Sequence, residues 1–253
     1  MPVELNEEAL RRALRSAGLP DGGVRWDALT ESTNATALAM AREGAPEWTL
    51  VAAGHQFAGR GRLGRTWESA PGDSLLFSVV LRPELPPDRA VLLTLLAGAA
   101  MALSCRVAGV QDVECKWPND LLLGGAKVGG ILAEAAVAGG RIEHVVIGVG
   151  VNLAGPPPGV EGAAGLGGLE AEPLLAGFLG GIGEPIDPAS FTTKTLARYR
   201  PLCGTLGRRV RATTTDGRAV EGTAVDVDDD GALVVEAAAG RSTVGFGEVE
   251  HLR

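Results

Sequence analysis

Cysteine and histidine are scarce in this sequence, and neither is arranged for cross-links or metal binding. The three cysteines, Cys105, Cys115 and Cys203, stand far apart, and no Cys-x-x-Cys motif occurs. The three histidines show no metal-ligand spacing either. We therefore predict neither a disulfide framework nor a protein-held metal site, and we interpret the cysteines as core thiols of a protein in a reducing compartment.

Basic residues and long apolar runs are also in short supply. Lys and Arg number 23 against 31 Asp and Glu, which gives a formal net charge of −8. Nucleic-acid-binding domains are usually basic, so we expect no nucleic-acid partner. Acidic residues occupy the place where a secretory signal would be basic. The longest apolar run, 91–105, spans about 15 residues and is too short to cross a membrane, so we expect a cytoplasmic protein without a membrane partner.

Against this acidic background, glycines and arginines alternate in one short segment. Three of each occur between Gly59 and Arg65, bracketed by Gln56 and Trp67. Glycine lets a backbone approach a ligand closely, and guanidinium groups match the geometry of phosphates and carboxylates. Residues 57–67 therefore predict a lid that closes over an anionic ligand.

The same segment also fits the dinucleotide-binding pattern, because glycines occur at positions 59, 61 and 64. That pattern requires a strand before the glycines and a helix after them. A strand at 48–53 is plausible, but residues 68–73 form a turn sequence that leads into another strand at 75–81. No kinase motif or Walker loop follows. We therefore disfavour a nucleotide-binding fold of these classes.

Three further segments narrow the interpretation. One is the turn Lys116-Trp117-Pro118-Asn119-Asp120, and Lys127 follows it just before a Gly-Gly-Ile-Leu run. The second is an apolar strand at 145–153 that reaches Asn152, and the third is a helix start at Glu31-Ser32-Thr33-Asn34. The arginine loop, the Lys116–Asp120 turn, Lys127 and the strand that reaches Asn152 follow one another along the chain in the order typical of the biotin protein ligase family. With the helix start at 31–34, these segments resemble that family. The resemblance runs from about residue 24 to the C-terminus and is weakest across 155–200.

The resemblance implies a two-step reaction with biotin and ATP as substrates and Mg²⁺ as the accompanying ion. Biotin's carboxylate attacks the α-phosphate of ATP to give biotinyl-5′-AMP and pyrophosphate. A lysine of a biotin carboxyl carrier domain of an acyl-CoA carboxylase then attacks the activated carbonyl. Only about twenty residues precede Val24, so we expect the form without an N-terminal winged helix.

Carried over residue by residue, the resemblance also assigns the site. The catalytic residues are Lys127, Arg62 and Arg60. The biotin-binding residues are Ser32, Thr33, Asn34, Gln56, Gly59, Arg60, Gly61, Arg62 and Lys127. The ATP-binding residues are Arg60, Trp67, Asn119, Asp120 and Asn152.

Each of these residue types also has a simpler structural role. Ser32 or Thr33 could cap a helix, Trp67 could be a core residue, and Lys127 could be a solvated hairpin lysine. Whether Asp120 touches Mg²⁺ stays open. The family often has a Ser-Leu pair in the 160s, where this chain has Gly165-Leu166-Gly167-Gly168, so the contacts of that loop are in doubt.

The fold class predicted is α/β (α+β), with a mixed or antiparallel central sheet, flanking helices and a small C-terminal SH3-like β-barrel. Consecutive hairpins, with turns at 124–125 and 139–140, favour that sheet over a parallel one. We predict domain bounds of 1–203 and 204–253. The expected helices are 6–18, 32–42, 87–106 and 187–199, and the expected strands are 24–29, 48–53, 75–81, 112–116, 121–123, 126–137, 141–153, 208–214, 218–226, 232–237 and 241–245.

Two rival functions stay open on the sequence. A lipoate ligase shares the adenylation chemistry but has a different arginine and glycine pattern. A biotin-sensing repressor would bind biotin without turnover. The sequence also leaves the protein as either a monomer or a homodimer.

Overall fold

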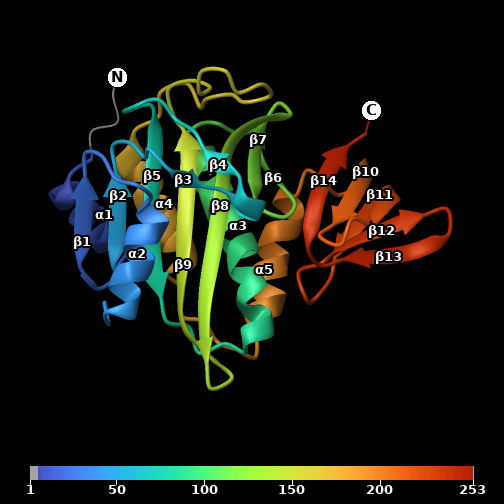
Figure 1. Cartoon of the computed structure of the whole chain (residues 1–253), viewed down its shortest axis with the longest axis horizontal. Helices are drawn as coiled ribbons and strands as arrows, with labels where there is room; N and C mark the ends of the chain where they lie inside the picture. Colours follow the sequence, from blue (N-terminus) through green and yellow to red (C-terminus); the bar gives the residue numbers. More distant parts are fainter. Residues whose placement is uncertain (1–4, 253) are drawn as a thin grey trace.

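The computed structural model describes residues 5–252 and places a seven-stranded sheet beside a smaller C-terminal sheet (Figure 1). The helices are α1 (Glu7–Ser16), α2 (Thr33–Arg42), α3 (Ala90–Val107), α4 (Ala171–Ile182) and α5 (Phe191–Tyr199). The strands of the large sheet are β1 (Val24–Asp27), β2 (Leu50–Ala53), β5 (Ser74–Leu81), β6 (Val113–Lys116), β7 (Asp120–Leu123), β8 (Ala126–Ala138) and β9 (Arg141–Asn152). Short 3₁₀ turns cover Arg62–Gly64, Pro87–Arg89 and Arg200–Leu202.

The large sheet is mixed, as predicted from the hairpins. Its order is β1-β2-β5-β9-β8-β7-β6. Only the β1–β2 pair is parallel among these neighbours, and the other pairs are antiparallel. The β7–β8 and β8–β9 hairpins turn at Gly124-Gly125 and Gly139-Gly140, where all four glycines have positive φ angles that side chains disfavour.

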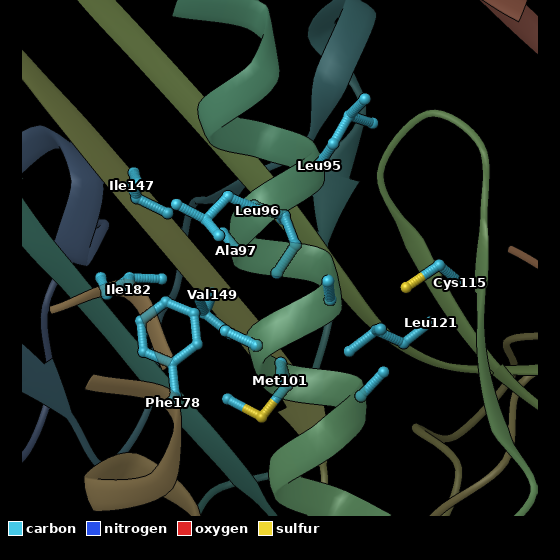
Figure 2. Close-up of a cluster of buried hydrophobic side chains, with 14 of the residues drawn as sticks. Leu95, Leu96, Ala97, Met101, Cys115, Leu121, Ile147, Val149, Phe178 and Ile182 are labelled. Atoms are coloured by element: carbon cyan, nitrogen blue, oxygen red, sulfur yellow. The ribbon is translucent and has the colours of Figure 1, made fainter. Parts of the chain in front are cut away.

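One face of the sheet carries the main hydrophobic core. Helices α3 and α4 pack on that face, where Figure 2 shows Met101 and Phe178 near Val149 of β9. Phe178 also meets Phe77 of β5 edge to face, with ring centroids 5.0 Å apart. The period of two along β5 and β9 directs these apolar side chains to the same side.

The opposite face is only partly apolar. Helix α2 lies against it through a small cluster that includes Ala37, Val51, Val80 and Val146. Farther along β5 and β9 on the same face the apolar side chains give way to Ser78 and to glycines. The polar N-terminus of α2 lies over these positions, and the candidate site forms there.

The C-terminal sheet is antiparallel, in the order β13-β12-β11-β10-β14. Its strands are β10 (Arg209–Thr214), β11 (Ala219–Val227), β12 (Leu233–Ala237), β13 (Gly240–Val244) and β14 (Gly247–His251). Strand pairing among the described residues leaves β13 and β14 as its two edges. The SH3-like barrel and the boundary at residue 204 therefore stay predictions.

The C-terminal unit is joined to the rest of the chain through a buried tryptophan. The Trp117 indole N–H donates to the Gly231 carbonyl at 2.9 Å, and its backbone N–H donates to Thr205 Oγ1 at 3.0 Å. Trp117 is 1% exposed. Hydrogen bonds from Trp117 to Thr205 and Gly231 thus fix the turn that begins at Lys116 against the C-terminal part of the chain.

Several elements and bounds differ from the sequence prediction. The short strands at Gly59–Arg60 and Thr66–Trp67 were not predicted, and the helix expected at 187–199 begins at Phe191. Helix α4 and strand β14 were not predicted, and the structure shows both. The apolar run at 91–105 is part of a longer helical segment, Pro87–Val107, whose length and hydropathy would suffice for a membrane span. Because 67% of its most apolar window is buried inside the fold, this segment occupies the place of a core helix.

Candidate active site

A cavity of about 330 Å³ lies on the partly polar face of the large sheet. It is bounded by the N-terminus of α2, the arginine loop, the Lys116–Asp120 turn and strands β8 and β9. Strand β14 closes one side through Glu248, Val249 and Glu250. Elements far apart in the sequence therefore meet at one cavity. Figure 1 shows the central sheet and the C-terminal sheet side by side.

Glycines of β8 and β9 form the floor under Trp67. Gly130 pairs with Gly150 across the two strands. A Cβ atom added at Gly150 would lie 2.5 Å from Trp67 Cε2, and one at Gly130 would lie 3.3 Å from Cζ3. Only glycine at position 150 lets the indole lie this close to the sheet.

Trp67 is not an ordinary core tryptophan. It is half-buried and lines the cavity, and Lys127 Nζ lies 5.7 Å from the centroid of its ring. Its buried indole N–H has no hydrogen-bond partner within residues 5–252. A flat apolar surface beside an ammonium group suits a planar, anionic ligand.

Lys127 and Asp120 form an ion pair across the β7–β8 hairpin. Lys127 Nζ lies 2.6 Å from Asp120 Oδ1, and the two side chains are 40% and 23% exposed. The neighbouring Asn119 is fixed by Ile131, whose carbonyl accepts from Asn119 Nδ2 at 2.9 Å. The turn predicted around Asn119 and Asp120 thus directs the Asp120 carboxylate at the lysine, while the Asn119 amide oxygen faces Arg62.

The arginine loop is a short hairpin attached to β14. Strands β3 (Gly59–Arg60) and β4 (Thr66–Trp67) pair on either side of the 3₁₀ turn. Arg62 Nη1 donates to Asn119 Oδ1 at 3.1 Å and to the Gly247 carbonyl at 3.4 Å. Arg65 forms an ion pair with Glu248. These contacts hold the loop over the cavity.

The arginines of the loop differ in their surroundings. Burial lowers the pKa of Arg62, while the nearby Asp120 and Glu248 carboxylates oppose that shift. Arg60 is more exposed and lies 3.7 Å from Glu31. Arg62 is therefore the partly desolvated cation, whose hydrogen bonds to an anion are stronger than those of a solvated one.

The other end of the cavity is polar but neutral. Ser32 caps α2, and its Oγ accepts from the Ala35 N–H at 3.5 Å. Gln56 Oε1 accepts from the Thr33 N–H at 2.7 Å and from the Thr33 hydroxyl at 3.1 Å. The capping role that we considered for Ser32 is thus present, and Ser32 lines the cavity as well.

Most of the predicted site residues line this one cavity. The lining includes Lys127, Arg60, Gly61 and Arg62, the α2 residues 32–34, Gln56, Trp67, Asn119 and Asp120. Gly59 and Asn152 are not part of it. Gly59 lies within the loop and pairs with Trp67, so an added Cβ would be 2.5 Å from the Trp67 carbonyl oxygen.

Asn152 is buried at the end of β9. Its Nδ2 donates to the Ala164 carbonyl at 3.0 Å, and Ser74 Oγ lies 3.4 Å from its Oδ1. The backbone of Lys127 also pairs with this loop, through the Gly162 carbonyl and the Ala164 N–H. Residues 162–164 therefore connect Asn152 to the start of β8.

Sequence reasoning missed several residues at the site. Lys116 and Glu248 line the cavity, and Ser78 and Glu134 contact its lining residues from behind. Lys116 stood within a quoted motif and could have been found there. Ser78 is a single hydroxyl in an apolar strand, and only the sheet register brings it to α2.

No group of three or more His, Cys, Asp or Glu side chains is placed to hold a metal ion within residues 5–252. The carboxylates that line the cavity are Asp120, Glu248 and Glu250. Two of these carboxylates already face a cation, because Asp120 pairs with Lys127 and Glu248 pairs with Arg65.

Two family models match the chain. Residues 26–152 match the Biotin/lipoate A/B protein ligase family, and residues 205–252 match the Biotin protein ligase C terminal domain. The first match contains the predicted site residues, and the second contains the C-terminal sheet with β14. The two parts of the chain that enclose the cavity thus each match a family model that includes biotin protein ligases.

Characterised relatives and solved structures agree with these matches. The chain is 34% identical to a biotin--[acetyl-CoA-carboxylase] ligase of Mycobacterium tuberculosis, over 98% of this chain and 96% of the relative. It is 31% identical to the bifunctional ligase/repressor BirA of Bacillus subtilis, over 98% of this chain and 80% of the relative. A biotin protein ligase from Aquifex aeolicus in complex with biotin and ATP superposes with a TM-score of 0.74 at 21% identity, covering 91% and 99% of the two chains, which establishes a shared fold.

Proposed function

Since the chain belongs to the biotin protein ligase family, we propose that it activates biotin with ATP and transfers it to a lysine of a biotin carboxyl carrier domain. The observation that carries this proposal is the composition of the one cavity. A neutral polar end at Ser32, Thr33 and Gln56 suits biotin's ureido ring, and a cationic end at Lys127 and Arg62 suits its carboxylate beside a phosphate.

In the first step, an oxygen of biotin's carboxylate attacks the α-phosphorus of ATP. The new P–O bond gives biotinyl-5′-AMP, and the bond to the β-phosphate breaks with release of pyrophosphate. Two anions about 4 Å apart repel by roughly 4 kcal/mol near a protein surface. Lys127 offsets this repulsion by exchanging its contact with Asp120, 2.6 Å away, for the oxygens of the two substrates. Arg60 and Arg62 add positive charge from the loop.

In the second step, the carrier's lysine amine attacks the carbonyl carbon of biotinyl-5′-AMP. An amide bond forms, the amine loses a proton, and AMP leaves with the electrons of the broken C–O bond. The anhydride is hydrolysable, so it must be shielded from water until the carrier arrives. Arg62, tied to Asn119 and Gly247, is placed to hold the phosphate under the loop.

The nucleotide lies, in our proposal, over the Trp67 side of the cavity. Trp67 offers a flat surface and an N–H that has no partner within residues 5–252, and Asn119 and Asp120 face the phosphates. Asn152 contributes from beneath by fixing the loop at Ala164. The same loop pairs with the backbone of Lys127, so nucleotide contacts and the catalytic lysine are connected.

Mg²⁺ would enter with the polyphosphate of ATP. Mg²⁺ keeps several waters and is usually bound by phosphates together with one or two carboxylates. The cavity offers Asp120 and Glu250 for such a role without a dedicated protein cage. When bound, the ion offsets charge on the leaving pyrophosphate.

We also propose that the enzyme works in the cytoplasm on carrier domains of acyl-CoA carboxylases. The three cysteines at 105, 115 and 203 are buried free thiols, as suits a reducing compartment. Burial raises the pKa of Cys105 to about 12. Such a thiol is protonated at neutral pH and is inert toward the anhydride.

Pyrophosphate release tests the proposal directly. Purified protein is incubated with ATP and Mg²⁺, with and without biotin, and pyrophosphate is measured. We expect release only with biotin, and incorporation of biotin into an added carrier domain. Release with lipoate but not with biotin would reassign the enzyme as a lipoate ligase. Saturable biotin binding without pyrophosphate release would instead indicate a binding module.

A further inference from the structure

A buried hydroxyl lies directly behind the neutral end of the cavity. Ser78 of β5 is 0% exposed and does not line the cavity itself. Its Oγ lies 2.8 Å from Thr33 Oγ1 and 2.6 Å from Asn34 Oδ1. Because this hydroxyl touches two cavity residues at the start of α2, it can determine how both are oriented.

The amide of Asn34 has a single orientation in this network. Its Nδ2 lies 2.8 Å from Glu134 Oε2 and 3.3 Å from the Leu132 carbonyl, and both of these groups accept hydrogen bonds. The amide oxygen must then face Ser78. Asn34 thus has its donor and its acceptor engaged by the protein, and its amide is not offered to a ligand.

Counting protons fixes what Thr33 presents to the cavity. An amide oxygen only accepts, so the 2.6 Å contact between Ser78 and Asn34 takes the Ser78 proton. The Thr33 proton then goes to Ser78 Oγ at 2.8 Å or to Gln56 Oε1 at 3.1 Å. In either case the proton is held within the protein, so Thr33 Oγ1 can act toward a ligand only as an acceptor.

The network depends on an absent side chain in β9. Gly148 pairs with Ser78 on one side and with Leu132 on the other. A Cβ atom added at Gly148 would lie 1.9 Å from Asn34 Oδ1. The Asn34 amide therefore spans from β5 to β8 through the space that this glycine leaves.

We infer that Ser78 is a positioning residue for the ureido ring of biotin, acting through Thr33 and Asn34. Because the Thr33 hydroxyl donates its proton to Ser78 or Gln56, Thr33 Oγ1 accepts a hydrogen bond from a ureido N–H. Gln56 Oε1 is occupied by Thr33, so its amide N–H groups are left to donate to the ureido oxygen. This inference rests on the proposed function, because it assigns the polarity of the biotin end of the same cavity.

The test compares two buried serines, one next to the cavity and one away from it. In Ser78→Ala the network loses its central proton. Ser104→Ala is the matched control, because Ser104 is also buried and donates to a protein acceptor, the Leu174 carbonyl at 2.8 Å, but lies on α3 outside the cavity. Biotin binding by calorimetry and pyrophosphate-release kinetics are measured for both variants, with thermal melting as the check of folding.

We expect Ser78→Ala to raise the Kd and KM for biotin about tenfold, as for a hydrogen bond of about 1.4 kcal/mol. The KM for ATP and the kcat at saturating biotin should stay within about threefold, because the cationic end is untouched. Ser104→Ala should leave both substrate constants unchanged. Ser78→Cys, which keeps a weak donor at the same place, should bind biotin better than the alanine variant.

Biotin affinity of folded Ser78→Ala equal to wild type would overturn the inference, as would an equal loss in Ser104→Ala. If Ser78→Ala does not fold, Glu134→Ala decides, because it removes the acceptor at 2.8 Å that orients the Asn34 amide from the other side. Unchanged biotin affinity in that variant would then refute the inference. Failure of the wild-type protein to bind biotin would refute the proposed function instead.

Discussion

Replacing Lys127 should affect the rate of adenylation far more than the stability of the fold. In the structure Lys127 pairs only with Asp120, across a gap of 2.6 Å, among the described residues. Lys127→Met keeps most of the apolar stem that lies beside Trp67 and removes the ammonium group. The variant leaves Asp120 without its partner at the point where two further anions must meet.

The structure sets the size of both effects. The side chains of the ion pair are 40% and 23% exposed, so solvent screens the pair and its loss costs roughly 0–1 kcal/mol of stability. That corresponds to a drop in melting temperature of about 2–4 °C or less. In adenylation, one missing charge about 4 Å from the reacting oxygens costs roughly 4 kcal/mol. The rate should therefore fall by about a thousandfold.

The assay is biotin-dependent pyrophosphate release, with thermal melting of the same preparations. Lys194→Met is the control, because Lys194 is an exposed lysine of α5 outside the cavity. We expect its activity to equal that of wild type. Folded Lys127→Met with activity within about threefold of wild type, less than 1 kcal/mol in barrier height, would refute the role of this lysine.

Three further predictions follow from the site and from β14. Arg62→Gly should release biotinyl-5′-AMP about ten- to hundredfold faster, seen as biotin on added albumin in a blot. Gly150→Ala should raise the KM for ATP more than that for biotin, because its Cβ would lie 2.5 Å from Trp67 Cε2. Burial, then Lys116 and Arg208, lower the pKa of His251 to about 4. Between about pH 6.5 and 4, the His251 side chain is protonated in the unfolded chain but not in the folded chain. The free energy of unfolding of wild type should therefore decrease relative to that of His251→Gln as the pH falls, as measured by urea denaturation.

Each of these predictions has an outcome that contradicts it. Equal albumin labelling by wild type and Arg62→Gly, with adenylation intact, would mean that Arg62 does not retain the intermediate. An unchanged KM for ATP in Gly150→Ala would separate Trp67 from the nucleotide. Parallel pH profiles for wild type and His251→Gln would mean that His251 takes up its proton equally in the folded and unfolded chains.

The sequence predicted the sheet, and it predicted that the arginine loop would lie at the candidate site, because both signals are local. Gly139-Gly140 between two strand patterns predicts a hairpin. The composition of the arginine loop predicts an anion site. Helix α4 gave no such signal, since it contains Pro173 and two glycines that face α3. A Cβ added at Gly177 would lie 2.5 Å from Ser104 Oγ, and one at Gly181 would lie 2.8 Å from the Ala100 Cβ. Close packing on α3 forms this helix in spite of its low propensity.

The contribution of β14 and Ser78 could not be predicted for a related reason. Both act only through contacts with residues far away in the chain. Ser78 meets Asn34 of α2 because the β5–β9 register places Gly148 beside Ser78, where the missing side chain leaves room for the amide. Glu248 meets Arg65 because β14 pairs with β10. The proposed biotin contacts all lay between Ser32 and Lys127, whereas the cavity also includes residues 148–150 and 248–250.

Strand β9 shows how one sequence pattern serves the core and the site at once. Its residues 147–152 alternate, with Ile147, Val149 and Val151 buried in the core. The alternate positions are Gly148, Gly150 and Asn152, and they face the ligand side. Glycine inside a strand costs roughly 0.5–1 kcal/mol relative to alanine, and here each one leaves room for a side chain that lines the cavity, Asn34 at Gly148 and Trp67 at Gly150. The other face of β9 is fully packed in the core. This packing stabilises the strand, so glycines are tolerated on the face toward the cavity.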